Sequence, residues 1–173
     1  MPENEAKVSI FDRAFLFADA VYEVTSVLNG KLVDFDNHIK RLKKSMKELD
    51  FGPKINEEEF LAFHRKLVEL NEIKEGIVYL QVSRGVAERD FTFPDSKTAL
   101  TITAFTQKKE LIDNPSVHNG ISIITVDDLR WKRCDIKTVQ LLYPSIAKTE
   151  AMKQGADDAW MVQNGYVMEG SSN

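Results

Sequence analysis

Residues 20–35, AVYEVTSVLNGKLVDF, decide how the first half of this chain folds. Residues 20–28 are rich in β-branched and aromatic side chains, which favour an extended strand. Asn29-Gly30 follows, the dipeptide that best tolerates the positive φ angles of a two-residue hairpin turn. Residues 31–35 are the natural return strand, so the stretch predicts a β-hairpin.

Two amphipathic helices are predicted after the hairpin. Asp36 can cap the first helix, and Gly52-Pro53 ends it. Asn56, with Glu59 three positions later, reads as a capping-box variant that opens the second helix. Apolar residues recur at spacings of three and four in both, namely Ile39, Leu42, Met46 and Leu49 in the first and Phe60, Phe63, Leu67 and Leu70 in the second.

The hydrophobic period then changes from that of a helix to that of a strand. Residues 76–84 alternate, with Val78, Leu80 and Val82 on one face and Tyr79, Gln81 and Ser83 on the other. A strand whose second face carries hydroxyls and amides often lines a polar cavity, and an ordinary solvated face is the alternative. Residues 98–105 read as a further strand, and residues 8–11 as a short one.

The second half of the chain continues the mixture of helix and strand. Residues 108–120 are the best linker candidate, because they combine charge, Pro115 and Gly120 with weak periodicity. After them we predict a strand (121–126), an irregular basic segment (128–137), a helix introduced by Pro144 and a hairpin (156–162 and 166–168) turned at Asn164-Gly165. This order indicates an α+β fold rather than a parallel βαβ series.

Composition excludes several classes of protein. With 43% apolar and 29% charged residues, the chain has enough apolar surface to fold, so disorder is not expected. No stretch is long and uncharged enough to span a membrane, and the acidic, polar start does not resemble a secretory signal. A net charge of -4 argues against a mainly electrostatic nucleic-acid binder. Cys134 is the only cysteine, which favours the cytoplasm.

Searches for common catalytic motifs are negative. The sequence contains no glycine-rich phosphate loop and no nucleophile elbow. His38, His64 and His118 lack metal-ligand spacing, so no metal site is predicted. Cys134 has no evident activating partner and reads as an inert small residue.

The unusual segment is residues 127–138, DDLRWKRCDIKT, whose charges do not form a helical face. Lys137 lies in it between Ile136 and the run 139–142. Apolar surroundings favour the neutral amine of a lysine, which is a nucleophile. The alternative is a surface lysine whose stem lies along apolar neighbours.

Five motifs, taken together, resemble the class IV (fold-type IV) pyridoxal-phosphate-dependent aminotransferases, closest to the D-amino-acid aminotransferases. They are residues 17–23 (FADAVYE), 38–42 (HIKRL), 79–85 (YLQVSRG), 130–138 (RWKRCDIKT) and 169–173 (EGSSN). Each is weak alone, but all five occur in the family's order and at comparable intervals.

The resemblance implies a site for pyridoxal 5′-phosphate. Lys137 matches the lysine that forms a Schiff base with the cofactor and moves the substrate proton, and Glu169 matches the carboxylate that faces the pyridine nitrogen. Arg41 matches the arginine that holds the phosphate, the alternative being a solvated residue on a basic helix face. Ser171 and Ser172 match small hydroxyl residues near the cofactor, the alternative being a polar turn.

The resemblance also implies a substrate site. Tyr22, Tyr79 and Arg89 match positions that help recognise the substrate α-carboxylate in D-amino-acid aminotransferases. Arg89 lies in a loop that reaches the partner subunit's active site in this family, which implies a homodimer; the alternative is an exposed pairing with Glu88 or Asp90. Phe91 stands where a histidine is expected, which removes one donor and makes the pocket more apolar.

The fold implied is an α+β, two-domain fold-type IV architecture. We expect a small N-terminal α/β domain at residues 1–112 and the first part of a larger, mixed-sheet pseudobarrel domain at residues 113–173. Family members run to about twice a typical single domain, and this chain stops at Asn173, inside the last motif. We therefore expect a truncated second domain, a clipped N-terminal strand, and no active enzyme from these residues alone.

The activity implied is ping-pong transamination between a D-amino acid, such as alanine or glutamate, and a 2-oxo acid. A branched-chain L-amino-acid aminotransferase is the alternative within the family, and aminodeoxychorismate lyase is a less favoured one. A non-catalytic interaction module that retains the fold is the alternative from another class. The joint presence of Lys137, Glu169 and Arg41 argues against the module, which has no physical need for the three together.

Overall fold

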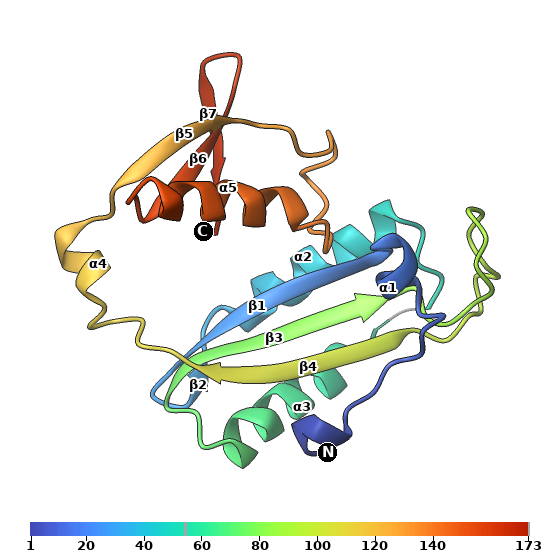
Figure 1. The fold of residues 1–173 in the computed structure, drawn as a ribbon. Coiled ribbons are helices and arrows are strands. Elements are labelled where there is room, and N and C mark those ends of the chain that lie inside the picture. Colours follow the sequence, from blue (N-terminus) through green and yellow to red (C-terminus); the bar gives the residue numbers. More distant parts are fainter. Residues whose placement is uncertain (54, 173) are drawn as a thin grey trace. The chain divides into compact units, whose positions relative to one another are not determined.

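A computed structural model describes residues 1–53 and 55–172 of the chain (Figure 1). The chain divides into two compact units. The first comprises Met1–Glu110 together with Asp135–Val139, and the second comprises Leu111–Cys134 and the chain from Gln140 onward. The predicted domain boundary at residue 112 stays a prediction about the complete protein.

The first unit is built on a four-stranded antiparallel sheet (Figure 1). Its strands are β1 (Ala20–Leu28), β2 (Lys31–Leu32), β3 (Glu75–Ser83) and β4 (Thr101–Lys108), in the order β2-β1-β3-β4. The predicted hairpin is confirmed, since Asn29 and Gly30 have φ angles of 50° and 73° and join β1 to β2. The return strand is shorter than expected, because Asp34 adopts a left-handed conformation and α2 begins at Phe35.

Helices α2 (Phe35–Glu48) and α3 (Glu57–Leu70) cover one face of this sheet (Figure 1). The cap predicted for α3 is confirmed, because the Asn56 side chain accepts hydrogen bonds from the backbone N–H groups of Glu58 and Glu59. The cap predicted for α2 is wrong. Asp36 lies in the first turn, and Asp34 at the N-cap makes no side-chain capping bond.

The main core lies between the sheet and the two helices. Inward side chains of β1 and β3 pack against the apolar faces of both helices; the buried residues include Val21, Leu80, Val82, Ile39, Leu42, Met46 and Phe60. The expectation for Leu70 is wrong, because it is the last residue of α3 and its side chain is 67% exposed. The remaining predicted core positions of both helices are buried or partly buried.

The segment before β1 contains two short helical turns and no strand. Residues 8–11 form no strand, which corrects the prediction. A short 3-10 turn, η1 (Glu3–Glu5), and a short helix, α1 (Arg13–Phe17), occupy this region. Asp12 caps α1 by accepting a hydrogen bond from the Ala14 backbone N–H at 2.9 Å, which turns the chain into a helix at this point.

The second unit contains a three-stranded mixed sheet. Its elements are α4 (Pro115–Asn119), β5 (Ile123–Asp127), α5 (Leu142–Lys153), β6 (Asp158–Gln163) and β7 (Tyr166–Gly170). Strand β5 pairs in parallel with β6, which forms the predicted hairpin with β7. Ala147 and Ala151 of α5 pack against Ala159 of β6. The predicted linker therefore contains α4, and the helix predicted from Pro144 begins two residues earlier.

In residues 1–53 and 55–172, no helix has the length and apolar character needed to cross a bilayer.

Gly76 offers a test of the register between β3 and β4. It has a φ of 153°, and a Cβ placed on it would lie 2.1 Å from the backbone oxygen of Gln107. We expect Gly76→Ala to destabilise the complete protein by about 2–4 kcal/mol, because a backbone atom of β4 must move. Gly30→Ala is the control, since φ is 73° there and the nearest such atom is 3.8 Å away. Urea unfolding measures both, and equal losses would contradict the prediction.

Candidate functional site

Three aromatic rings lie side by side on the sheet face that α2 and α3 leave uncovered. Tyr22 of β1 stacks on Tyr79 of β3, with ring centroids 5.6 Å apart, and Tyr79 stacks on Phe105 of β4 at 4.8 Å. The alternation of the strands produces this arrangement, because Val21 and Leu80 next to these tyrosines point into the core. The polar second face predicted for residues 76–84 is thus a partly exposed aromatic surface.

The Tyr79 hydroxyl donates a hydrogen bond to Oε1 of Gln81 at 2.9 Å. Burial, together with the charge that Tyr22 would carry, raises the pKa of Tyr79 to about 12. Its phenol therefore remains protonated through the physiological pH range and acts as a hydrogen-bond donor on this face.

Lys137 lies at one end of this aromatic surface. Its Nζ donates to the Tyr22 hydroxyl at 3.3 Å and lies 4.4 Å from the centre of the Tyr22 ring. The backbone is held on both sides, since the Tyr22 N–H donates to the Lys137 carbonyl at 3.0 Å and the Val139 N–H donates to the Ala20 carbonyl at 3.2 Å. Ile136, the preceding residue, is buried in the core.

These contacts describe the surroundings of the Lys137 amine, and its role in binding a cofactor stays a prediction. Its side chain is only partly exposed, and within the described part of the first unit the Nζ atom pairs with no carboxylate. An amine fixed by a neighbouring strand, and not neutralised by an acid, is available to a ligand at the aromatic surface.

Arg41 of α2 forms an ion pair with Glu23 of β1. Its Nε and Nη2 donate to the two carboxylate oxygens of Glu23 at 2.7 and 2.6 Å. The ring of His38 also contacts Glu23, with 2.8 Å between Nδ1 and Oε2. The Glu23 side chain is 1% exposed, whereas that of Arg41 is 50% exposed. In the described part of the chain Nη1 of Arg41 makes no hydrogen bond, so one donor of the fork remains for an anion.

The ion pair sets the protonation of both partners. Burial opposes the charge of Glu23, but hydrogen bonds from Arg41 and His38 outweigh it and lower the pKa of the carboxyl group. The hydrogen bond to Glu23 raises the pKa of Arg41. Arg41 thus keeps its positive charge and is held in one orientation by a buried carboxylate that the sequence analysis did not single out.

The remaining predicted cofactor residues lie in the second unit. Glu169 pairs with Arg130, which also binds Asp128 at 2.8 Å. Together with Trp131, Lys132 and other residues they line a cavity of about 580 Å³. Glu169 is therefore a lining residue of a polar cavity, and its carboxylate is engaged by a cation.

Ser171 and Ser172 bind a buried carboxylate. Both hydroxyls donate to Asp158, Ser172 at 2.9 Å, and the Asp158 carboxylate is further paired with Lys148 at 3.4 Å. Asp158 is 2% exposed; burial works against its charge, but these hydrogen bonds lower its pKa. These hydrogen bonds order both serines, and their place beside a cofactor stays a prediction. Asn173, the last residue of this motif, lies outside the described residues.

Arg89 lies in the loop after β3 and packs on aromatic rings. Its guanidinium carbon is 5.6 Å from the ring centres of both Phe17 and Phe91. In the described part of the chain no ion pair joins Arg89 to Glu88 or Asp90, which were the alternative partners. The side chain is exposed and carries an unneutralised charge at the end of the first unit's sheet.

The predicted site residues thus form two groups. Lys137, Tyr22 and Tyr79 come together in the first unit, which also carries Arg41 and Arg89, whereas Glu169, Ser171 and Ser172 belong to the second. That the two groups enclose one cofactor stays a prediction. Sequence reasoning missed Glu23 and Asp158, although both are acidic residues inside strands, which is itself an unusual pattern. Over residues 1–53 and 55–172, no group of three or more His, Cys, Asp or Glu side chains could hold a metal ion.

The architecture is shared with solved transaminases. A fold IV-transaminase from Curtobacterium pusillum matches with a TM-score of 0.81 at 21% identity, over 99% of this chain and 60% of that protein. The branched-chain amino acid aminotransferase of Escherichia coli matches with a TM-score of 0.82 at 16% identity, again over 99% and 60% of the two chains. These likenesses show the fold, and they confirm the predicted fold-type IV architecture.

Sequence comparison defines the family. The family model described as amino-transferase class IV matches residues 20–173. The D-alanine aminotransferase of Staphylococcus aureus strain MSSA476 is 41% identical over 172 residues, which cover 98% of this chain and 60% of that protein. The chain belongs to the class IV aminotransferase family, as its five motifs indicate. It spans about 60% of the length of the curated relatives it matches.

The buried pair of Glu23 and Arg41 predicts a pH-dependent stability. Glu23→Gln should destabilise the complete, cofactor-free protein at pH 7 by about 1–3 kcal/mol, because Arg41 loses a charged acceptor. Since the folded pKa of Glu23 is below its ordinary value of 4.5, the advantage of the native residue is fully present above that pH. It is lost as the pH falls through the folded pKa.

Urea unfolding at several pH values measures this difference. Glu57→Gln is the matched control, because Glu57 is 58% exposed and pairs with the exposed Lys43; its loss should be about 0.5 kcal/mol or less. A Glu23→Gln difference that does not change with pH would refute the linkage.

Proposed function

We propose that the complete protein is a pyridoxal-phosphate-dependent transaminase that exchanges an amino group between a D-amino acid and a 2-oxo acid. The observation that carries the proposal is the Lys137 amine, held 3.3 Å from the Tyr22 hydroxyl on an open aromatic surface. The relative in Staphylococcus aureus, 41% identical, is named a D-alanine aminotransferase, which supports the substrate class.

The residues present fit this cofactor. Pyridoxal phosphate needs an amine for its aldehyde, a cation for its phosphate and an acid for its ring nitrogen, and Lys137, Arg41 and Glu169 have these chemistries. Arg41 fits the phosphate because Glu23 orients its fork and leaves Nη1 available. Glu169 would have to exchange its pairing with Arg130 for the ring nitrogen. When bound, the cofactor takes up the electrons left on the substrate α-carbon after its proton departs.

Lys137 would then act as the acid–base group. Its Nζ would take the proton from the substrate α-carbon and hold it for return, which is the proton transfer that transamination requires. The Tyr22 hydroxyl would orient Nζ, because it accepts a hydrogen bond from the amine. The amino group of the D-amino acid would pass to a 2-oxo acid, so that the first becomes a 2-oxo acid and the second an amino acid.

Arg89, with Tyr22 and Tyr79, would hold the substrate α-carboxylate. A guanidinium binds a carboxylate through two parallel hydrogen bonds, which fixes the α-carbon and selects the hydrogen that is removed. The Tyr79 phenol remains protonated, and it would have to exchange its hydrogen bond to Gln81 for one to the carboxylate. We place Arg89 in the active site of a second copy of the chain, so the working enzyme is a homodimer, and we place the enzyme in the cytoplasm.

Phe91 favours one alternative, an aminotransferase for branched-chain L-amino acids. It stands where D-amino-acid aminotransferases are expected to have a histidine, and its ring is 80% exposed beside Arg89. An apolar ring in place of a donor suits a bulkier, apolar side chain in the substrate. Release of pyruvate without an amino acceptor would instead indicate the lyase.

A covalent trapping experiment tests the role of Lys137. Reduction of the complete, cofactor-loaded protein with borohydride should fix the cofactor on the peptide that contains Lys137, because reduction converts a carbon–nitrogen double bond into a stable single bond. Mass spectrometry of the digested protein locates the label, and visible absorbance follows cofactor binding. Lys66→Ala, at an exposed lysine of α3 paired with Glu69, should keep the label on Lys137. If the Lys137→Ala variant keeps full activity and is labelled at another lysine, the assignment of Lys137 as the cofactor-binding lysine is rejected.

A second experiment decides the substrate. With 2-oxoglutarate as acceptor, we expect faster transamination of D-alanine than of L-leucine by the complete protein, since Arg89 supplies the carboxylate clamp described above. Chiral chromatography of the amino-acid products follows both reactions. Activity confined to L-leucine would replace the first proposal with the branched-chain alternative. If neither amino acid is transaminated while the cofactor is still bound, the result would point to the lyase.

A further inference from the structure

The loop that carries Arg89 is fixed to the segment before β1 by its backbone. The Arg13 N–H donates to the Gly85 carbonyl at 3.0 Å, and the Ala87 N–H donates to the Phe11 carbonyl at 3.3 Å. Asp12 and Val86 form an isolated antiparallel bridge between these hydrogen bonds. The start of the loop is therefore held two residues before Arg89.

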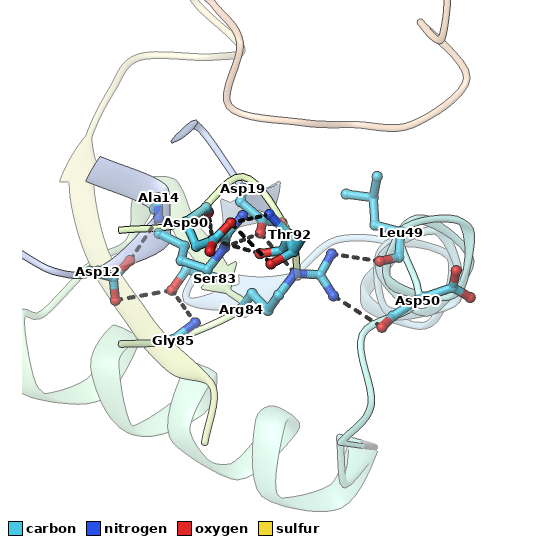
Figure 2. Close-up of polar contacts among 11 residues, drawn as sticks. Asp12, Ala14, Asp19, Leu49, Asp50, Ser83, Arg84, Gly85, Asp90 and Thr92 are labelled. Carbon is cyan, nitrogen blue, oxygen red and sulfur yellow. Dashed lines mark hydrogen bonds and ion pairs between the residues drawn. The ribbon is translucent and has the colours of Figure 1, made fainter. Parts of the chain in front are cut away.

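The Arg13 side chain holds the loop just beyond Arg89. Its Nη1 donates to the backbone carbonyls of Asp90 at 2.8 Å and Thr92 at 3.4 Å. Its Nε donates to Oδ2 of Asp19 at 2.7 Å, and the whole residue is only 2% exposed. Figure 2 shows Asp90 and Thr92 gathered beside Asp19. A buried guanidinium thus ties the main chain of the loop to the body of the first unit.

A second buried arginine, Arg84, contacts the loop beyond Arg89, at Phe93. Arg84 donates through Nε to the same Oδ2 of Asp19 at 2.8 Å and through its other nitrogens to the carbonyls of Asp50 and Leu49 at 3.0 and 2.6 Å (Figure 2). Its guanidinium carbon lies 3.8 Å from the ring centre of Phe93. Asp19 is shared by the two arginines, so the loop is anchored to one common carboxylate.

Arg89 lies between these anchors and touches the same aromatic ring as Arg13. The guanidinium carbons of Arg13 and Arg89 lie 4.5 and 5.6 Å from the centre of the Phe17 ring. Phe17 in turn packs edge-on against Phe91, with ring centres 5.6 Å apart. Arg13 is therefore linked to Arg89 in two indirect ways: it binds the main chain at Asp90, the next residue, and it contacts the Phe17 ring that Arg89 also contacts.

We propose that Arg13 is a positioning residue for Arg89: by holding the carbonyls of Asp90 and Thr92 and the ring of Phe17, it sets where the exposed guanidinium binds a substrate carboxylate. The inference rests on the proposed function, in which Arg89 contacts the substrate. Arg13 itself is buried, so it would act through Arg89 and not by contact with the substrate. Its planar fork is required, because a lysine can pair with Asp19 but cannot also reach the loop carbonyls in the same geometry.

The test is a double-mutant cycle on the complete, cofactor-loaded enzyme, with Arg13→Lys, Arg89→Ala and the combination of both. Steady-state assays with D-alanine and 2-oxoglutarate give KM and kcat. We expect Arg13→Lys to raise KM on the order of 10-fold, with a smaller change in kcat, because a displaced clamp weakens binding. Adding Arg13→Lys to Arg89→Ala should raise KM no further, since Arg13 acts through Arg89. Arg65→Lys, at an exposed position of α3, is the matched control.

The outcomes separate positioning from a general structural role. An unchanged KM in Arg13→Lys, or effects that multiply in the double variant, would overturn the inference. If the Arg13→Lys variant does not bind the cofactor, as judged by its absorbance, Phe17→Leu takes its place in the same cycle. Effects of Phe17→Leu and Arg89→Ala on KM that multiply in the double variant would also overturn the inference. If Arg89→Ala leaves KM unchanged in an active enzyme, Arg89 does not bind the substrate, and the positioning role of Arg13 is refuted with it. Failure of the proposed function itself is distinct: Lys137 would then not be labelled by borohydride.

Discussion

The antiparallel pairing of β1 with β3 is the interaction on which the rest of the first unit depends. It runs the whole length of both strands, from Ala20 opposite Ser83 to Leu28 opposite Glu75. Because side chains alternate along paired strands, this register puts Val21, Leu80 and Val82 under the helices and leaves Tyr22 and Tyr79 on the open face. A slip of one residue would bury the tyrosines and expose the core. The start of β1 also binds the backbone on both sides of Lys137, so the position of this lysine depends on the sheet.

Buried carboxylates provide the second level of organisation. Glu23, Asp19 and Asp158 are all nearly inaccessible, and each is paired with at least one cation. Charges withdrawn from water are tolerated when they are paired and hydrogen-bonded, and the partner is then held in one geometry. Glu23 orients Arg41 in this way, Asp19 orients Arg13 and Arg84, and Asp158 orders Ser171 and Ser172. Three of the predicted cofactor residues, Arg41, Ser171 and Ser172, are thus held in place by buried acidic side chains.

Local chemistry explains which elements could be predicted and which could not. Asn29-Gly30 and the cap of α3 at Asn56 follow from φ preferences and a side-chain hydrogen bond, and both are confirmed. Residues 8–11 alternate like a strand, but they find no partner strand, and Asp12 turns the chain into α1 instead. Asp36 has the chemistry of a cap, yet the left-handed turn at Asp34 starts α2 before it. Lys137 could be singled out because it lies in an unusual segment and in a motif, whereas Glu23 and Asp158 look like isolated acids until their partners from distant elements are in place.

The sequence by itself determined the family, the α+β class, the first hairpin and the types of side chain available for chemistry, because these depend on residue identity and on neighbours a few positions away. Only the tertiary structure decided that Tyr22 binds Lys137, that Arg41 is oriented by Glu23, and that Arg13 and Arg84 share Asp19 beside the Arg89 loop. The physical reason is distance along the chain. Arg13 and Asp90, or Tyr22 and Lys137, meet only after sheet pairing and core packing have brought their elements together, and no local preference encodes those distances.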